Sequence, residues 1–148
     1  MIVPDANLLL YAYDAKSPHH LVARKWWESC LSGNEPVGLT FPVIFAFVRV
    51  STLANVFEQP LSLTKATKQV ELWVDRQVTR VLSPAADHCQ QVLNLLREAA
   101  SAGGNLVTDA QVAAVAIAHG ATVHTADRDF MRFQKLNCYY PLDQSARK

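Results

Sequence analysis

The 148-residue chain lacks a charge imbalance, because 14 Lys and Arg residues stand against 13 Asp and Glu residues and leave a formal net charge of +1. No global field draws such a protein to nucleic acid or to an anionic membrane, so any binding to a polyanion must come from local clustering. Long hydrophobic runs are also missing. The apolar stretches Phe41–Val48 and Val112–Ala118 fall far short of the roughly 20 residues that a membrane helix needs.

Cysteine is scarce, with three residues and no CxxC pair. Widely spaced Cys30, Cys89 and Cys138 fit reduced, buried thiols in a cytoplasmic protein better than a disulfide framework or a zinc site. The amino terminus has no basic segment followed by a long apolar run, so we expect no secretory signal. The phosphate-binding patterns GxxxxGK and GxGxxG are absent as well, which argues against a nucleotide cofactor.

Apolar residues make up 50% of the chain, enough for one domain with a sizeable core. We expect a single domain over residues 1–142 and a short carboxyl-terminal tail over residues 143–148. Short β-type runs alternate with amphipathic helical segments, which is typical of an α/β fold on a mostly parallel sheet. The predicted strands are Ile2–Pro4, Val37–Leu39, Val78–Leu82 and Ala121–Thr125. The predicted helices are Leu8–Tyr13, His19–Leu31, Phe41–Val50, Lys65–Arg76, Ala85–Ala100 and Asp109–His119, the last followed by Gly120 at its carboxyl end.

Three carboxylates stand where a short apolar run passes into a helix or a turn. Asp5 follows the first predicted strand, and Asn7 is a candidate N-cap for the helix after it. Thr108 is a candidate N-cap that places Asp109 in the first turn of its helix, where exposed N–H groups favour a negative side chain. Asp127 follows the last predicted strand.

Parallel α/β sheets gather their ligands beyond the carboxyl ends of the strands, so these three acids are candidates for one crevice. Clustered carboxylates need a compensating positive charge, and a hard divalent cation such as Mg²⁺ or Mn²⁺ prefers oxygen ligands. A site without His or Cys argues against zinc. Taken singly, each Asp is equally compatible with an ordinary N-cap or turn.

Three segments together resemble the PIN-domain ribonucleases, and among them the VapC-type toxins of toxin–antitoxin pairs. The opening residues 2–12 (IVPDANLLLYA) are similar to the start of that family, and residues 105–110 (NLVTDA) are similar to its third acidic segment. Residues 120–130 (GATVHTADRDF) resemble its closing T-x-D-x-D-F pattern. The likeness covers nearly the whole chain in the right order.

The resemblance implies a three-layer α/β/α sandwich and an endoribonuclease that depends on Mg²⁺ or Mn²⁺. Asp5, Asp109 and Asp127 match the family's metal-binding acids, and Asp129 matches an accessory acid. Asn7 and Thr125 are expected to support the cluster by hydrogen bonds.

The resemblance also implies partners: an RNA substrate, a cognate VapB-type antitoxin and a second copy of the chain in a homodimer. The apolar segment Phe41–Val48 exceeds what one helix face buries, so part of it is a candidate dimer surface. Arg49, Arg128 and Arg132 are candidates for contacts with the RNA backbone. Each of the three is also compatible with an ordinary surface charge or a partner for a nearby acid.

One position departs from the family pattern. Family members commonly carry a Glu in the helix after the second strand, three residues before an Arg, and here Ala46 precedes Arg49 at that spacing. The alternative function is therefore a PIN-fold module that binds RNA or a partner with weak or no catalysis. A phosphoacceptor receiver domain, which also gathers Asp residues at strand ends, is disfavoured because it needs paired acids after its first strand.

Overall fold

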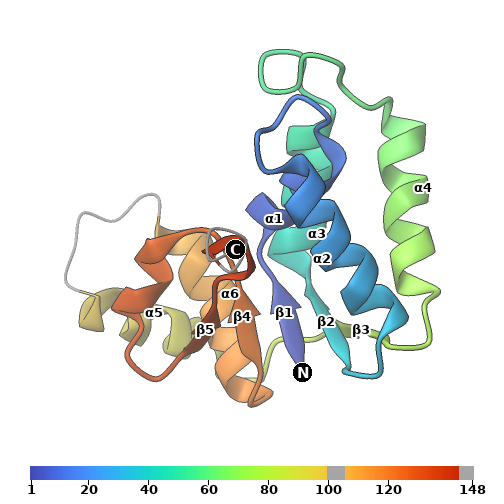
Figure 1. Cartoon of the computed structure of the whole chain (residues 1–148). Coiled ribbons are helices and arrows are strands. Elements are labelled where there is room, and N and C mark those ends of the chain that lie inside the picture. The colour runs from blue at the N-terminus through green and yellow to red at the C-terminus, as the bar shows by residue number, and fades with distance from the viewer. Residues whose placement is uncertain (100–105, 144–148) are drawn as a thin grey trace.

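A computed structural model of the chain describes residues 1–99 and 106–143. A central sheet lies between two layers of helices, which is the α/β/α sandwich that the family resemblance implies (Figure 1). The strands are β1 (Ile2–Pro4), β2 (Val37–Thr40), β3 (Thr79–Leu82), β4 (Thr122–His124) and β5 (Asn137–Tyr139).

All pairings in the sheet are parallel, and the strand order is β3-β2-β1-β4-β5. The first strand is therefore central, between β2 and β4. In register, Pro4 pairs with His124, and His124 pairs with Tyr139. The fold thus brings the segments after Pro4 and after His124 side by side at the carboxyl ends of the strands, although they are about 120 residues apart in sequence.

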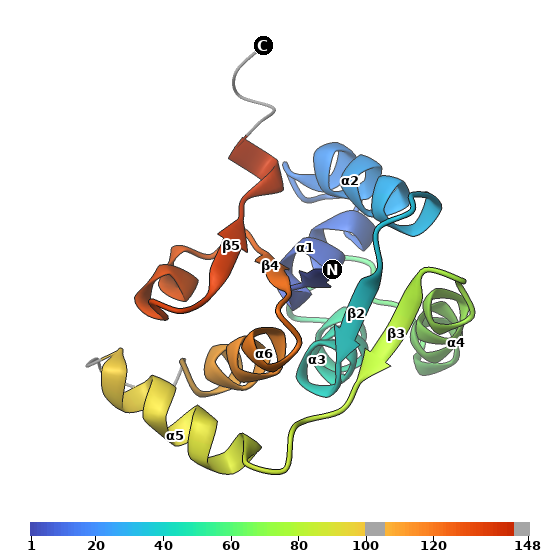
Figure 2. The same cartoon turned by 90° about the horizontal axis from the view of Figure 1, so that it is seen from below.

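Helices follow each strand but the last, after which the described chain ends in a short 3-10 turn over residues 141–143. They are α1 (Ala6–Tyr13), α2 (His20–Ser32), α3 (Phe41–Ser51), α4 (Leu63–Val74), α5 (His88–Glu98), α6 (Leu106–Ala118) and the 3-10 helix η1 (Arg128–Arg132). Figure 2 shows α1 and α2 over one face of the sheet and α3, α5 and α6 over the other. The helix α4 joins the α2 side, where Trp73 meets Trp27 edge to face at 5.5 Å.

The core lies where these layers meet. Val3 and Val123 at the centre of the sheet are fully buried, and α6 has an almost continuous buried run from Val112 to Ala116. Trp27 and Trp73 are nearly inaccessible, as expected for core aromatics. No helix in the described part of the chain has both the length and the apolar character for a membrane span.

The helix ends correct several predictions. Asp5, not Asn7, caps α1, because the Asp5 carboxylate accepts from the Ala6 N–H while Asn7 already lies inside the helix. Thr108 is not an N-cap, since α6 begins at Leu106. The prediction for Gly120 is confirmed, with a φ of 60° that favours glycine after the helix.

Other corrections concern α5, β5 and one thiol. The helix α5 begins at His88 rather than Ala85, and the carboxyl end predicted at Ala100 lies outside the described residues. The sequence does not predict β5, which is a short, partly exposed edge strand. Cys89 is exposed, so the expectation of a buried thiol is wrong at that position, whereas Cys30 is buried and all three thiols are free.

Candidate functional site

Asp5 anchors the site at the carboxyl end of β1. Its side chain is 9% exposed, and its two oxygens accept hydrogen bonds from the Ala6 N–H at 2.7 Å and the Thr125 hydroxyl at 2.7 Å. Burial is the main cause that raises the pKa of Asp5 to about 6, and the nearby Asp127 adds to the rise. The two hydrogen bonds act in the opposite direction but do not offset burial.

Thr125 joins the two central strands at this edge. It is fully buried, its hydroxyl donates to Asp5, and the same oxygen accepts from the Asp127 N–H at 2.9 Å. The Asn7 amide contacts this hydroxyl at 3.4 Å, and its carbonyl oxygen accepts from the Ala126 N–H at 3.4 Å. The structure thus brings together Asn7, Thr125 and two of the predicted acids in one hydrogen-bonded group.

Asp127 and Asp129 lie at the start of η1. The Asp127 carboxylate caps this short helix by accepting from the Asp129 N–H at 2.8 Å. Asp129 in turn accepts from Arg132 Nε at 2.9 Å. Asp127 therefore has an ordinary capping role as well as its place beside Asp5, and Arg132 neutralises Asp129 rather than pointing alone to solvent.

Asp109 lies in the first turn of α6, in the layer of helices that also contains α3 and α5. It is half-buried, and no described residue donates a hydrogen bond or forms an ion pair with its carboxylate. Burial is the largest cause that raises its pKa to about 7, followed by the negative charges of Asp5, Asp127 and Asp129. The four predicted acids thus lie close enough to repel one another, although they come from both ends of the chain.

The chemistry of these side chains suits a divalent cation. The donors are all carboxylate oxygens, and Asp109 has neither a hydrogen-bond donor nor a cation against it among the described residues. As they stand, no three acidic, His or Cys side chains in residues 1–99 and 106–143 are arranged closely enough to surround an ion. Mg²⁺ does not require that many direct ligands, because it keeps several waters and binds through one or two carboxylates with substrate phosphate.

The three candidate arginines differ in their surroundings. Arg128 pairs with Asp143 and lies 4.0 Å above the Tyr140 ring, and Arg132 pairs with Asp129. Arg49, in the last turn of α3, is exposed and forms no ion pair with any described residue. Ala46 is half-buried on the same helix, and α3 has no acidic residue at all. The helix therefore brings no carboxylate to the cluster.

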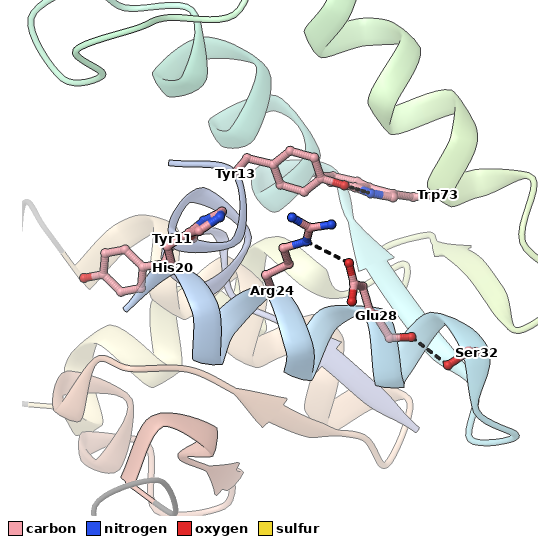
Figure 3. A network of polar contacts seen from close by, with 7 residues as sticks. All are labelled: Tyr11, Tyr13, His20, Arg24, Glu28, Ser32 and Trp73. Atoms are coloured by element: carbon pink, nitrogen blue, oxygen red, sulfur yellow. Dashed lines mark hydrogen bonds and ion pairs between the residues drawn. The ribbon is translucent and has the colours of Figure 1, made fainter. Parts of the chain in front are cut away.

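A separate groove lies between α2 and α4. Three hollows of about 270, 520 and 370 Å³ all include Tyr13. Figure 3 shows Tyr13 over the groove, where its hydroxyl accepts from Trp73 Nε1 at 3.0 Å, and Arg24 paired with Glu28 at 2.8 Å on α2. Burial raises the pKa of the Tyr13 hydroxyl, so this end of the groove is apolar with charges at its rim.

A group of aromatic rings lies next to the acids, and the sequence analysis does not predict it. Trp26 Nε1 donates to His124 Nδ1 at 3.2 Å, and the His124 ring lies 4.6 Å from that of Tyr139. Trp26 and His124 are 98 positions apart. No local sequence pattern links them. They meet because β4 pairs with β1 and α2 lies over this part of the sheet.

Comparisons with known proteins agree with this architecture. The PIN domain family model matches residues 2–136. The chain is 38% identical over 142 residues to Ribonuclease VapC33 of Mycobacterium tuberculosis, covering 96% of this chain and 99% of that protein. It is 36% identical over 134 residues to Ribonuclease VapC37 of the same organism, covering 90% and 92%.

Solved structures share the fold. VapBC2 from Rickettsia felis, bound to a DNA fragment from its promoter, aligns with a TM-score of 0.67 at 20% identity, covering 94% of this chain and 98% of that chain. M. tuberculosis VapC20, described as a sarcin-ricin loop cleaving toxin, aligns with a TM-score of 0.65 at 21% identity, covering 88% and 93%.

The fold defines an α/β/α protein with a parallel sheet, and the candidate acids lie at the carboxyl ends of its central strands. More particularly, the chain belongs to the PIN-domain family. The resemblance to VapC-type ribonucleases that the motifs carry is confirmed by relatives that match almost end to end.

Proposed function

We propose that the protein is a metal-dependent endoribonuclease and the toxin of a VapBC-type toxin–antitoxin pair. The observation that carries the proposal is the partly buried Asp109 carboxylate, which has no cationic partner among residues 1–99 and 106–143 and faces the charges of three other acids. Relatives named as VapC ribonucleases over 90% or more of the chain support the reaction class. Because those relatives are ribonucleases, they do not favour the alternative of a binding module without catalysis.

Asp5, Asp109 and Asp127 are the residues that would hold Mg²⁺ or Mn²⁺, with Asp129 assisting. When bound, such an ion supplies a Lewis acid that polarises a phosphoryl oxygen and acidifies the attacking water. Thr125 holds Asp5 in one rotamer through the 2.7 Å bond, so the carboxylate needs no reorganisation when substrate arrives.

The reaction is hydrolysis of a phosphodiester by in-line displacement. The oxygen of water bonds to phosphorus as the bond to the 3′-oxygen breaks, and a proton reaches that oxygen, which leaves a 5′-phosphate and a 3′-hydroxyl. Arg49 is the strongest candidate for a contact with the RNA backbone, because its guanidinium has no acidic partner within the described chain. Arg128 and Arg132 would have to exchange Asp143 and Asp129 for phosphate. The proposed site of action is the cytoplasm.

Two protein partners accompany this function. We propose that the groove between α2 and α4 receives the antitoxin, since it pairs an apolar, aromatic floor with charged rims. A second copy of the chain is the partner we propose for α3, where Phe41 and Phe45 stack at 6.3 Å and are 41% and 65% exposed. We also propose that residues 1–142 form a single domain.

The test is cleavage of a labelled RNA with Mn²⁺, with EDTA, and with Asp5→Asn in the presence of Mn²⁺. We expect EDTA to abolish cleavage and Asp5→Asn to reduce it by at least about 100-fold. Asp75→Asn, an exposed acid at the end of α4, is the matched control and should cleave like the parent. Cleavage that persists with both the chelator and the substitution would refute the proposal.

A calorimetric titration with Mn²⁺ separates the enzyme from the binding module. The enzyme requires saturable binding that Asp5→Asn weakens. A protein that binds RNA but shows no saturable Mn²⁺ binding is the module.

A further inference from the structure

A hollow of about 520 Å³ lies on the α2 side of the sheet, beside β1, β4 and β5. Figure 2 shows α5 and α6 on the opposite face of this half of the sheet. The wall of the hollow is aromatic at one end and polar at the other. The lining residues are Ile2, Trp26, Ser29, Cys30, Gly33, Asn34, Glu35, Thr122, His124 and Tyr139. None of the candidate acids lines it, so it is distinct from the acid cluster.

The aromatic end is a row of three rings. His124 lies 5.9 Å from Trp26 and 4.6 Å from Tyr139, with tilted planes, and Tyr139 is 37% exposed. The Trp26 N–H donates to His124 Nδ1, so in the neutral ring the proton resides on Nε2, which is then a donor. Such a surface offers both stacking faces and one directed N–H group.

The polar end is formed by the loop that follows α2. Glu35 pairs with the amino group of Met1 at 3.2 Å, yet its side chain is 60% exposed. The carboxylate therefore retains acceptor capacity toward the hollow, and Ser29 and Asn34 line the hollow beside it.

The hollow adjoins the acid site through the backbone of β4. His124 is followed directly by Thr125, whose hydroxyl donates to Asp5, and the His124 carbonyl oxygen accepts from the Asp5 N–H at 2.8 Å. A nucleotide next to the acids is thus within reach of the ring row. Unpaired RNA bases are recognised by stacking on aromatic rings and by hydrogen bonds on their edges.

We propose that this hollow binds an unpaired guanine base of the RNA beside the cleavage site; the inference rests on the proposed function. Guanine presents two adjacent N–H groups, N1–H and N2–H, which match one carboxylate in a bidentate pair. Its opposite edge presents the acceptors O6 and N7, which match the His124 Nε2–H. Adenine and cytosine each offer a carboxylate one amino group, and uracil offers one imino N–H, so guanine makes the best use of Glu35.

The test is a fluorescence and NMR titration of the whole protein in EDTA with GMP, AMP, CMP and UMP, so that neither metal nor cleavage is required. We expect GMP to bind about tenfold more tightly than the other three nucleotides and to shift the ring signals of Trp26 and Tyr139. Glu35→Gln should remove that preference. Glu71→Gln is the matched control, since Glu71 is also in an exposed ion pair but lies on α4, and it should keep the preference. Thermal unfolding checks that both variants fold.

Equal binding of the four nucleotides, no binding, or an unchanged preference in Glu35→Gln would overturn the inference. A separate arm maps cut positions in a long RNA with Mn²⁺, where loss of a guanine preference only in Glu35→Gln is expected. If the parent does not cut RNA at all, the proposed function fails, whereas cutting without guanine preference overturns only this inference. A preference for an added antitoxin peptide over GMP in the same hollow would likewise overturn it.

Discussion

Asp109 shows how a single residue can work against the stability of the fold that contains it. Its carboxylate is half-buried, lacks a hydrogen-bond donor in the described chain, and faces three other acids, which together raise its pKa to about 7. Near pH 8 it is ionised and repelled by Asp5, Asp127 and Asp129. A residue retained at such a cost is typical of a functional site.

Asp109→Asn should therefore stabilise the metal-free protein. In EDTA at pH 8 we expect the free energy of unfolding to rise by roughly 1–2 kcal/mol, a figure discounted for the solvent that reaches the side chain. Urea unfolding measures this, with Asp75→Asn as a control expected to change it by less than about 0.5 kcal/mol. With saturating Mn²⁺ the order should reverse, because the ion stabilises only a protein that binds it. A variant less stable than the parent in EDTA would contradict the electrostatic account.

At the scale of elements, α3 exposes apolar side chains that packing within one chain does not explain. Val43, Ile44 and Phe47 face the core, while Phe45 is 65% exposed and stacks on Phe41. Beside them is a hollow of about 370 Å³ that Leu82 and Val115 help to line. An aromatic pair next to an apolar hollow is typical of an interface.

Phe45→Glu should convert a dimer into a monomer. Truncating or charging a central interface aromatic costs about 3 kcal/mol, or roughly a hundredfold in the dimer dissociation constant. Sedimentation velocity across a concentration series measures this, and Leu21→Glu is the control, since Leu21 on α2 is 78% exposed away from α3. A parent that is monomeric at all concentrations would refute the proposed dimer.

The elements also show what could be predicted from sequence. The alternation of short apolar runs with amphipathic segments is local, so β1, β2, α3 and the order of layers were accessible. Asp5 and Asp127 were accessible because they follow strand ends, and Asp109 and Asp129 because they match family motifs. Helix caps were not, since Asp5 and Asn7 are both good caps by residue type; in the fold Asp5 accepts from the Ala6 N–H, while the Asn7 side chain bonds to Thr125 and Ala126 on the distant β4 segment. The contact of Trp26 with His124 was not accessible either, because it depends on strand order rather than on any local period.

At the scale of the whole molecule, titratable groups on either side of β4 act on stability in opposite directions. Burial lowers the pKa of His124 to about 4, although Glu35 opposes the change and the amino terminus reinforces it. Burial raises the pKa of Asp5 to about 6 and of Asp109 to about 7. The unfolded chain thus binds more protons at His124 than the folded protein does between about pH 4 and 6.5, and fewer at the two acids.

The contribution of His124 to the free energy of unfolding should accordingly be lost as the pH falls. Its stabilising effect is complete above about pH 6.5 and declines toward pH 4, whereas protonation of Asp5 and Asp109 relieves repulsion over the same range. In EDTA, the change in the free energy of unfolding from pH 7 to pH 5 should be more favourable to folding in His124→Gln than in the parent, by roughly 1–2 kcal/mol. Glutamine retains an acceptor for the Trp26 N–H, and His119→Gln at the exposed end of α6 is the control. Urea unfolding at the two pH values measures the difference, and identical changes in the parent and in His124→Gln would show that His124 contributes nothing to the pH response.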